Sequence, residues 1–114
     1  MERALIIDRF WLHLILNNLK TWEMRTSPTN IRGEIGLIEK GTGLIIGKCS
    51  LIDSLPAIPF DQYFNHIPRH RITRGDGVAH KWRYPWVLDD VEQFDEPIPY
   101  EHPRGAVIWV RLNK

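Results

Sequence analysis

The sequence has one amphipathic helical segment near its start and otherwise consists of short apolar runs. Apolar residues recur at three- and four-residue spacing between Phe10 and Leu19, which predicts a helix of about three turns, with Asp8 placed to cap it. Runs rich in β-branched residues predict strands over residues 3–8, 21–27, 31–39, 44–52, 86–91 and 106–112. Because the predicted helices and strands do not alternate along the sequence, the pattern excludes a doubly wound parallel sheet. The pattern predicts an α+β, mainly β fold: a small barrel of five or six strands with one N-terminal helix.

Length and composition fit a single globular domain over residues 1–114. A chain of 114 residues and 13.4 kDa has room for one core. Its 43% hydrophobic and 25% charged residues differ from the composition of disordered chains. The net charge of +1 lacks the basic excess of a general nucleic-acid coat, so any contact with nucleic acid has to rest on a local patch.

Cysteine content and hydropathy predict a cytoplasmic protein. The single cysteine, Cys49, excludes an internal disulfide and multi-cysteine zinc sites, and it suits a reducing compartment. No apolar stretch approaches the length of a membrane span, and the start of the chain does not have the pattern of a signal peptide. His66 and His70 have helical spacing, but Pro68 lies between them, so we expect neither a metal nor a cofactor.

The apolar pattern breaks between residues 55 and 79, where prolines interrupt it. Residues 60–64 predict a short helix, and residues 69–74 are basic. We expect a helical and loop insertion in the barrel. One alternative for the function is a protein-interaction module that uses this insertion.

Residues 18–25 carry charges of alternating sign immediately after the predicted helix. They read N-x-K-x-x-E-x-R, with Lys20, Glu23 and Arg25 as the charged positions. In a strand, side-chain alternation places Thr21, Glu23 and Arg25 on one face, which we expect to point outward. With Lys20 beside it, this cluster can hold an anionic or amide-bearing ligand.

Five tryptophans are unusual in so short a chain. Trp22 falls with Met24 on the inward face of the predicted strand, and we expect Trp22 and Trp109 in the core. Trp11 and Trp86 are the candidates for stacking on a planar ligand.

Four segments of the chain form a series. They are D-R-F-W-L-H-L-I-L at 8–16, N-x-K-x-x-E-x-R at 18–25, R-G-E-I at 32–35, and an ending that runs from Y-P-W-V-L at 84–88 through P-I-P-Y to G-A-V-I-W at 105–109. Over nearly the whole chain, this series resembles the ASCH domain family, a branch of the PUA-like superfamily. The family hallmark is G-x-K-x-x-E-x-R, and Asn18 stands here at the position of its glycine.

The resemblance implies a PUA-like β-barrel of the small single-domain kind found in bacteria and phages, with a cleft where Lys20, Glu23 and Arg25 converge. Relatives with PUA-like folds bind RNA or modified bases. Some family members act as amidohydrolases on acetylated cytidine, and others as ribonucleases. The acetylcytidine-type relatives use a threonine nucleophile inside the hallmark. Glu23 occupies that position here and cannot repeat a hydroxyl-based acyl transfer.

The favoured hypothesis is binding of single-stranded RNA or of a nucleoside or nucleotide ligand in this cleft. Lys20 and Arg25 would contact phosphate, and Glu23 would accept a hydrogen bond from a base or ribose. Trp11 and Trp86 would stack on a base.

The alternative is a small hydrolase at the same cleft, acting as a ribonuclease or as a modified-nucleoside amidohydrolase. Glu23 would serve as general base and Lys20 as electrostatic stabiliser. Thr21 as a rearranged nucleophile and His80 as a late acid or base are further catalytic candidates.

Overall fold

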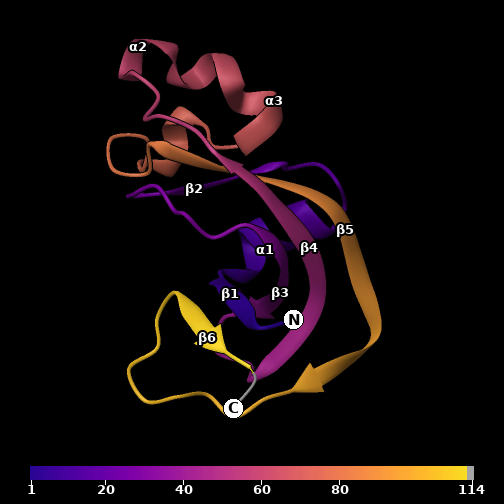
Figure 1. The fold of residues 1–114 in the computed structure, drawn as a ribbon. Helices are drawn as coiled ribbons and strands as arrows, with labels where there is room; N and C mark the ends of the chain where they lie inside the picture. The colour runs from indigo at the N-terminus through magenta and orange to yellow at the C-terminus, as the bar shows by residue number, and fades with distance from the viewer. Residues whose placement is uncertain (113–114) are drawn as a thin grey trace.

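The chain forms a six-stranded mixed β-sheet that curls into a half-barrel around helix α1 (Arg9–Leu16), as Figure 1 shows. This computed structural model describes residues 1–112. The strands are β1 (Arg3–Ile7), β2 (Trp22–Arg25), β3 (Gly33–Glu39), β4 (Leu44–Ser54), β5 (Tyr84–Pro99) and β6 (Trp109–Arg111). The mainly β architecture with one N-terminal helix, predicted from the sequence, is confirmed.

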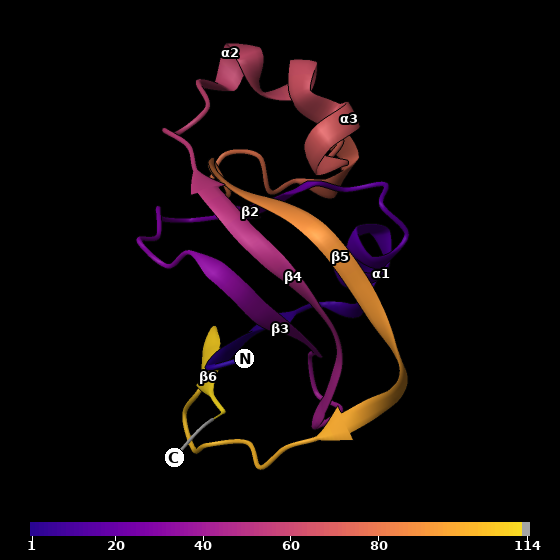
Figure 2. The same ribbon diagram turned by 45° about the vertical axis from the view of Figure 1, so that its right-hand side comes forward.

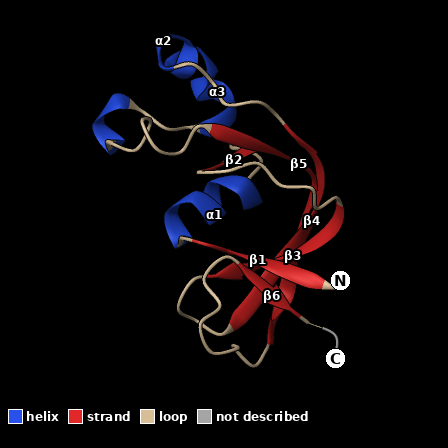
Figure 3. Cartoon of the chain, turned by 60° about the vertical axis from the view of Figure 1, so that its left-hand side comes forward, coloured by secondary structure: helices blue, strands red, loops and turns tan. Residues whose placement is uncertain are grey.

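Helical turns fill the segment between β4 and β5, which lies at one end of the molecule (Figures 1 and 3). They are α2 (Phe60–Tyr63), η1 (Phe64–His66), α3 (Ile67–His70) and η2 (Arg74–Asp76). The short helix predicted over residues 60–64 is confirmed, and the helical run continues through α3. Within residues 1–112, no helix is long and apolar enough to cross a membrane.

The sheet has the strand order β2-β5-β4-β3-β1-β6, and only β1 and β3 pair in parallel. In the described part of the chain, β2 and β6 are therefore the two edges, and no backbone pairing joins them. Figure 2 shows β4 and β5 as long, bent strands that carry the sheet around its curve. The β4–β5 register shifts at three points, and such irregularities increase the bend and twist of a strand pair.

Gly47 lies at one of these register shifts. A Cβ atom at this position would lie 2.6 Å from the carbonyl oxygen of Glu92 on β5. No side chain fits at that distance, so the close approach of the two strands at the bend requires glycine.

Strands β1 to β4 begin and end within two residues of their predicted bounds, whereas the last two strands differ more. β5 extends to Pro99, well beyond the predicted 86–91, because it continues to pair with β4 as far as Leu44. This half of β5 has no second strand partner in the described sheet, so its prolines are tolerated there as on an edge strand. β6 has three residues rather than the predicted 106–112. The residues before it bend away from the sheet and leave Val107 75% exposed.

Helix α1 and the strands share the larger of two apolar clusters. Its fully buried members include Leu12 and Ile15 of α1 together with Leu5 of β1. The apolar spacing in the sequence thus matches the buried face of the helix. Trp22 and Trp109, both predicted to be core residues, are partly buried and pack against this cluster.

Helix α1 ends at Leu16, three residues before its predicted end, and a residue with left-handed backbone geometry follows two positions later. Asn18 has a φ of 60°. The N–H groups of Asn18 and Lys20 donate to the carbonyls of Ile15 and Leu14 at 3.0 and 3.1 Å, which satisfies the last turn of the helix. Asparagine is among the non-glycine residues that adopt this conformation most readily. The glycine position of the hallmark is therefore the helix-ending position.

The helical segment between β4 and β5 is bonded to the corner between α1 and β2. The Arg71 Nε donates to the carbonyl of Leu19 at 2.6 Å. The backbone N–H of Thr21 donates to the carbonyl of Arg69 at 2.9 Å. The segment predicted as an insertion therefore also supports the corner that carries the charged motif.

His70 is the buried anchor of this segment. The N–H of Ile72 donates to His70 Nδ1 at 2.9 Å, so Nδ1 is unprotonated and the Nε2–H donates to the Tyr63 carbonyl at 2.8 Å. This arrangement requires the neutral imidazole. Burial lowers the pKa of His70 from 6.5 to about 4, because burial disfavours the charged ring.

We predict that His70 makes the protein less stable in acid. Because the folded pKa lies below the unfolded value of 6.5, the unfolded chain binds more protons between pH 6.5 and 4, and stability falls as the pH drops through that range. The difference between the folded and unfolded pKa values of His70 corresponds to about 3 kcal/mol of unfolding free energy. In urea unfolding, the His70→Gln variant should lose less unfolding free energy between pH 7 and 4 than the wild type does, by about this amount. The exposed His80→Gln control should behave like the wild type, and equal losses in all three proteins would contradict the assignment.

Candidate functional site

A cavity of about 240 Å³ opens between the uncovered side of β2 and the β1–β6 side of the half-barrel. Helix α1 with Asp8 before it, the turn between β3 and β4, and Trp82 just before β5 contribute the rest of its wall. We call it the Glu23 cavity. Its lining residues are Ile6, Asp8, Trp11, Glu23, Met24, Arg25, Thr26, Lys40, Trp82, Val107 and Ile108.

Arg25 connects the two sides of this opening. Its Nη2 donates to the Ile6 carbonyl of β1 at 2.9 Å, across strands that do not pair. The same guanidinium holds Glu23 Oε2, with Nε at 3.0 Å and Nη2 at 2.8 Å. The Arg25 Cζ lies 5.5 Å from the ring centroid of Trp86, which supports it from one side. Arg25 therefore joins β2 to β1 and, with the same guanidinium, holds the Glu23 carboxylate in place.

Glu23 is 6% exposed, so the expectation that its face of β2 points outward into solvent is wrong. Strand alternation places Glu23 and Arg25 on one face, as predicted, but that face turns toward β1 rather than toward water. Oε1 of Glu23 lies 3.9 Å from Lys20 Nζ, beyond hydrogen-bond distance, and accepts no hydrogen bond from residues 1–112. Glu23 lines the cavity, and Oε1 is the carboxylate oxygen that Arg25 does not hold.

Lys20 lies behind the carboxylate and is 2% exposed. Its Nζ donates to the His70 carbonyl at 2.6 Å and sits 4.8 Å from the ring centroid of Trp11. Burial lowers the pKa of Lys20 to about 8, and the nearby Glu23 partly offsets this effect. Lys20 is not among the cavity-lining residues. Its contacts tie the helical segment, α1 and the carboxylate together.

Two indole rings border the cavity. The Trp11 ring is one of them, and its centroid lies 6.3 Å from that of Trp82, with the ring planes 78° apart. Trp86, predicted as the second aromatic wall, is 3% exposed and does not line the cavity. Its ring stacks on Trp109 at 5.8 Å, and its Nε1 donates to the Ser27 carbonyl at 2.9 Å. Trp82 lies where the prediction placed Trp86, because the residues just before β5, rather than those within it, reach the opening.

Two further candidates do not lie in the Glu23 cavity. The Thr21 side chain is exposed, and its backbone groups bond to Arg69 and Leu88. His80 is exposed and lines a separate hollow with Phe60 and Phe64. Neither residue is brought to the carboxylate.

Asp8 and Lys40 were not predicted as site residues, yet both line the cavity and form an ion pair at 3.7 Å. Asp8 stands at the start of α1, but its side chain makes no capping hydrogen bond, contrary to expectation. The parallel pairing of Ile7 with Glu39 brings the ends of β1 and β3 together and places these two side chains side by side. Sequence spacing alone does not reveal a parallel pairing.

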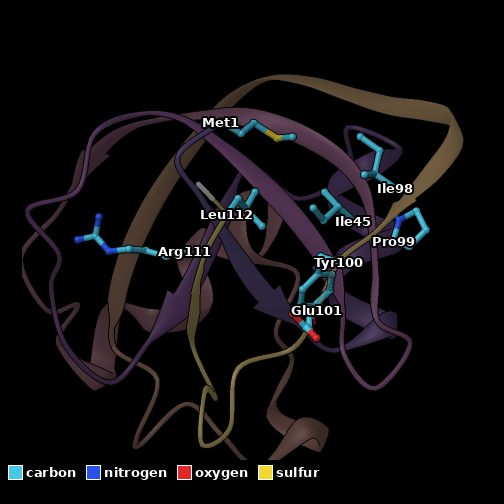
Figure 4. Close-up of a pocket in the computed structure, with 8 residues that line it drawn as sticks. All are labelled: Met1, Ile45, Ile98, Pro99, Tyr100, Glu101, Arg111 and Leu112. Carbon is cyan, nitrogen blue, oxygen red and sulfur yellow. The ribbon is translucent and has the colours of Figure 1, made fainter. Parts of the chain in front are cut away.

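Other hollows and histidines do not add to this site. A hollow of about 320 Å³ lies where the ends of the chain approach β4, and Figure 4 shows Tyr100 and Leu112 at it while Arg111 points away. None of the predicted site residues lines it. The His66 ring centroid lies 5.0 Å from that of Trp22, and His70 is buried. Residues 1–112 contain no group of three or more His, Cys, Asp or Glu arranged to hold a metal ion.

We predict that Arg25→Met destabilises the protein by about 3 kcal/mol, because it leaves the buried Glu23 carboxylate without its main partner. Adding Glu23→Gln should recover at least about 1 kcal/mol of this loss. Arg32→Met, which removes an exposed ion pair with Asp53, is the matched control and should change stability by less than about 1 kcal/mol. Urea unfolding measures all four proteins. Similar losses for the two arginine variants would contradict the role of Arg25.

The fold is similar to that of crystal structures of the ASCH protein from Zymomonas mobilis. One of them has a TM-score of 0.74 at 12% sequence identity and covers 98% of this chain and 87% of that chain. Two point mutants of the same protein each give a TM-score of 0.72 at 13% identity, with 98% of this chain and 88% and 90% of the other chains covered. At this level of identity the likeness shows the fold alone. No match is found among curated proteins.

The ASCH domain model matches residues 5–102, which include α1, the N-x-K-x-x-E-x-R motif and the cavity-lining residues up to Trp82. This match covers most of the chain and agrees with the curled, PUA-like sheet. The chain therefore belongs to the ASCH domain family.

Proposed function

We propose that the protein binds one base of single-stranded RNA, or of a modified nucleoside or nucleotide, in the Glu23 cavity. The observation that carries this proposal is the Glu23 carboxylate, which is buried at the wall of the cavity, held by Arg25 through Oε2 and without a hydrogen-bond donor at Oε1 among the described residues. A fixed and largely desolvated acceptor discriminates strongly between ligands that can and cannot donate to it.

The cavity suits the edge and faces of a base. Carboxylates accept hydrogen bonds from exocyclic amino groups such as N4 of cytosine. Trp11 and Trp82 supply aromatic surface, and stacking of a base on an aromatic ring contributes about 1–3 kcal/mol. A volume of about 240 Å³ is below the range common for drug-sized ligands, which favours a single base over a larger group.

The charges around the cavity favour recognition of the base over recognition of phosphate. Asp8 and Glu23 balance Arg25 and Lys40, so the lining has no excess of positive charge. Arg25 is engaged by Glu23 and by backbone, whereas the Lys40 side chain is 68% exposed. Lys40 is therefore the cation best placed to contact a phosphate outside the cavity. This differs from the hypothesis that Lys20 and Arg25 contact phosphate directly.

The alternative function is hydrolysis of RNA or of a modified nucleoside at the same cavity. The pKa of about 8 for Lys20, beside Glu23, favours it, because a buried amine with a lowered pKa suits acid–base chemistry. Glu23 would orient a water as general base. Lys20 would act from behind Glu23, and Thr21 would take no part because its side chain lies outside the cavity.

We predict that Glu23→Gln weakens ligand binding at least about tenfold, because a hydrogen bond to a charged acceptor contributes about 1.5–3 kcal/mol. The test is calorimetric titration of the protein with nucleoside monophosphates, N4-acetylcytidine and a mixed single-stranded RNA. Glu34→Gln, which changes an exposed carboxylate on β3, is the matched control and should bind like the wild type.

Mass spectrometry of the same mixtures separates the two functions. Binding without chemistry predicts that the ligand is recovered intact. A product that forms with the wild type and is lost in Glu23→Gln would establish the hydrolase instead. No binding by the wild type, or equal binding by Glu23→Gln, would contradict the proposed site.

A further inference from the structure

A second cavity adjoins the Glu23 cavity. It has a volume of about 410 Å³ and shares three lining residues with its neighbour, Ile6, Lys40 and Val107. We call it the His102 cavity. Its other walls come from the turn between β3 and β4 and from the segment between β5 and β6. Two cavities that share a wall can be occupied by one ligand that extends across it.

Hydrogen bonds shape the segment that encloses the His102 cavity. The Ala106 carbonyl can only accept, so the His102 Nε2 carries the proton and donates to it at 2.9 Å. His102 Nδ1 then accepts from the Tyr100 hydroxyl, also at 2.9 Å. The backbone N–H of Tyr100 donates to the Gly43 carbonyl at 3.1 Å, which anchors the segment to the turn. The cavity is thus preformed.

The lining of the His102 cavity suits a flat, uncharged ring. Tyr100 and His102 supply aromatic groups with ring centroids 5.8 Å apart. Gly41 and Gly43 expose backbone rather than side chains, and Ala106 adds a small apolar surface. No carboxylate lines this cavity, in contrast to the Glu23 cavity. Aromatic groups beside small residues form the kind of surface on which single-stranded bases stack.

Lys40 stands at the junction of the two cavities, because it lines both. Its side chain is 68% exposed, and its only ion pair within residues 1–112 is the 3.7 Å contact with the exposed Asp8. A solvent-exposed pair of this kind contributes little, so the ammonium group can turn to another anion at small cost. One cation at the junction of two cavities can contact the phosphodiester that links two nucleotides.

We propose that the ligand spans both cavities as two consecutive nucleotides of single-stranded RNA. The first base lies in the Glu23 cavity, the linking phosphodiester contacts Lys40, and the second base lies in the His102 cavity. This inference rests on the proposed function and narrows it from a single nucleotide to a dinucleotide step. Tyr100, His102 and Lys40 become ligand-binding residues outside the N-x-K-x-x-E-x-R motif.

The test compares the affinity of the protein for ribonucleoside 3′- and 5′-monophosphates with its affinity for dinucleoside monophosphates. Each probe carries one phosphate, a monoester of about −1.5 to −2 charge in the mononucleotides and a singly charged diester in the dinucleoside monophosphates, so a gain for the latter comes from the second nucleoside and not from added charge. We expect the preferred dinucleoside monophosphate to bind about tenfold more tightly, as one additional stacked base would provide. Ala106→Phe, which fills the His102 cavity, and His102→Ala, which removes one of its aromatic groups, should abolish this gain.

Both variants should bind the mononucleotide like the wild type, because neither residue lines the Glu23 cavity, and this result also shows that the variants are folded. Ala57→Phe, at a partly buried alanine that lines neither cavity, is the matched control and should keep the gain. Equal affinity for the two kinds of probe, or a gain that survives in Ala106→Phe and His102→Ala, would overturn the inference while leaving the proposed function in place. Failure of the wild type to bind either probe would overturn both.

Discussion

The Arg25 guanidinium joins two strands that the backbone of the sheet leaves apart. Within the described residues β2 and β6 are edges, and the contact from Arg25 to the Ile6 carbonyl spans the resulting opening. A partly buried guanidinium needs partners for its donors, and Glu23 supplies the charged one. The fold therefore requires a carboxylate at this point. The same carboxylate is a fixed hydrogen-bond acceptor at the wall of a cavity. Arg25 and Glu23 therefore both stabilise the half-barrel and form the candidate site.

Lys20 extends this dependence to the rest of the chain. It sits between the Trp11 ring, the Glu23 carboxylate and the His70 carbonyl, so α1, β2 and the helical segment after β4 all meet at one buried ammonium group. The network includes one acidic and two basic side chains of the motif. These contacts join the helical segment to Glu23 at the wall of the cavity. The helical segment thus stabilises the position of Lys20 beside Glu23.

The sequence predicted the main elements, the charged motif and the pairing of Glu23 with Arg25 on one strand face, because local periodicity determines these features. It did not predict that this face is buried, since alternation says which residues share a face but not what covers it. Asp8 and Lys40 meet through a parallel strand pairing that joins distant parts of the chain. The exchange of Trp86 for Trp82 follows from the path of the chain just before β5, which no local pattern sets.

The most direct test of the account is the response of the Glu23 carboxylate to a ligand, followed by the ¹³C resonance of its Cδ in a glutamate-labelled sample. We predict that a nucleotide that binds will shift the Glu23 resonance in proportion to occupancy, while the resonance of the exposed Glu34 stays in place. A bound nucleotide that leaves the Glu23 resonance unmoved would show that the carboxylate serves the fold alone and that recognition occurs elsewhere on the protein.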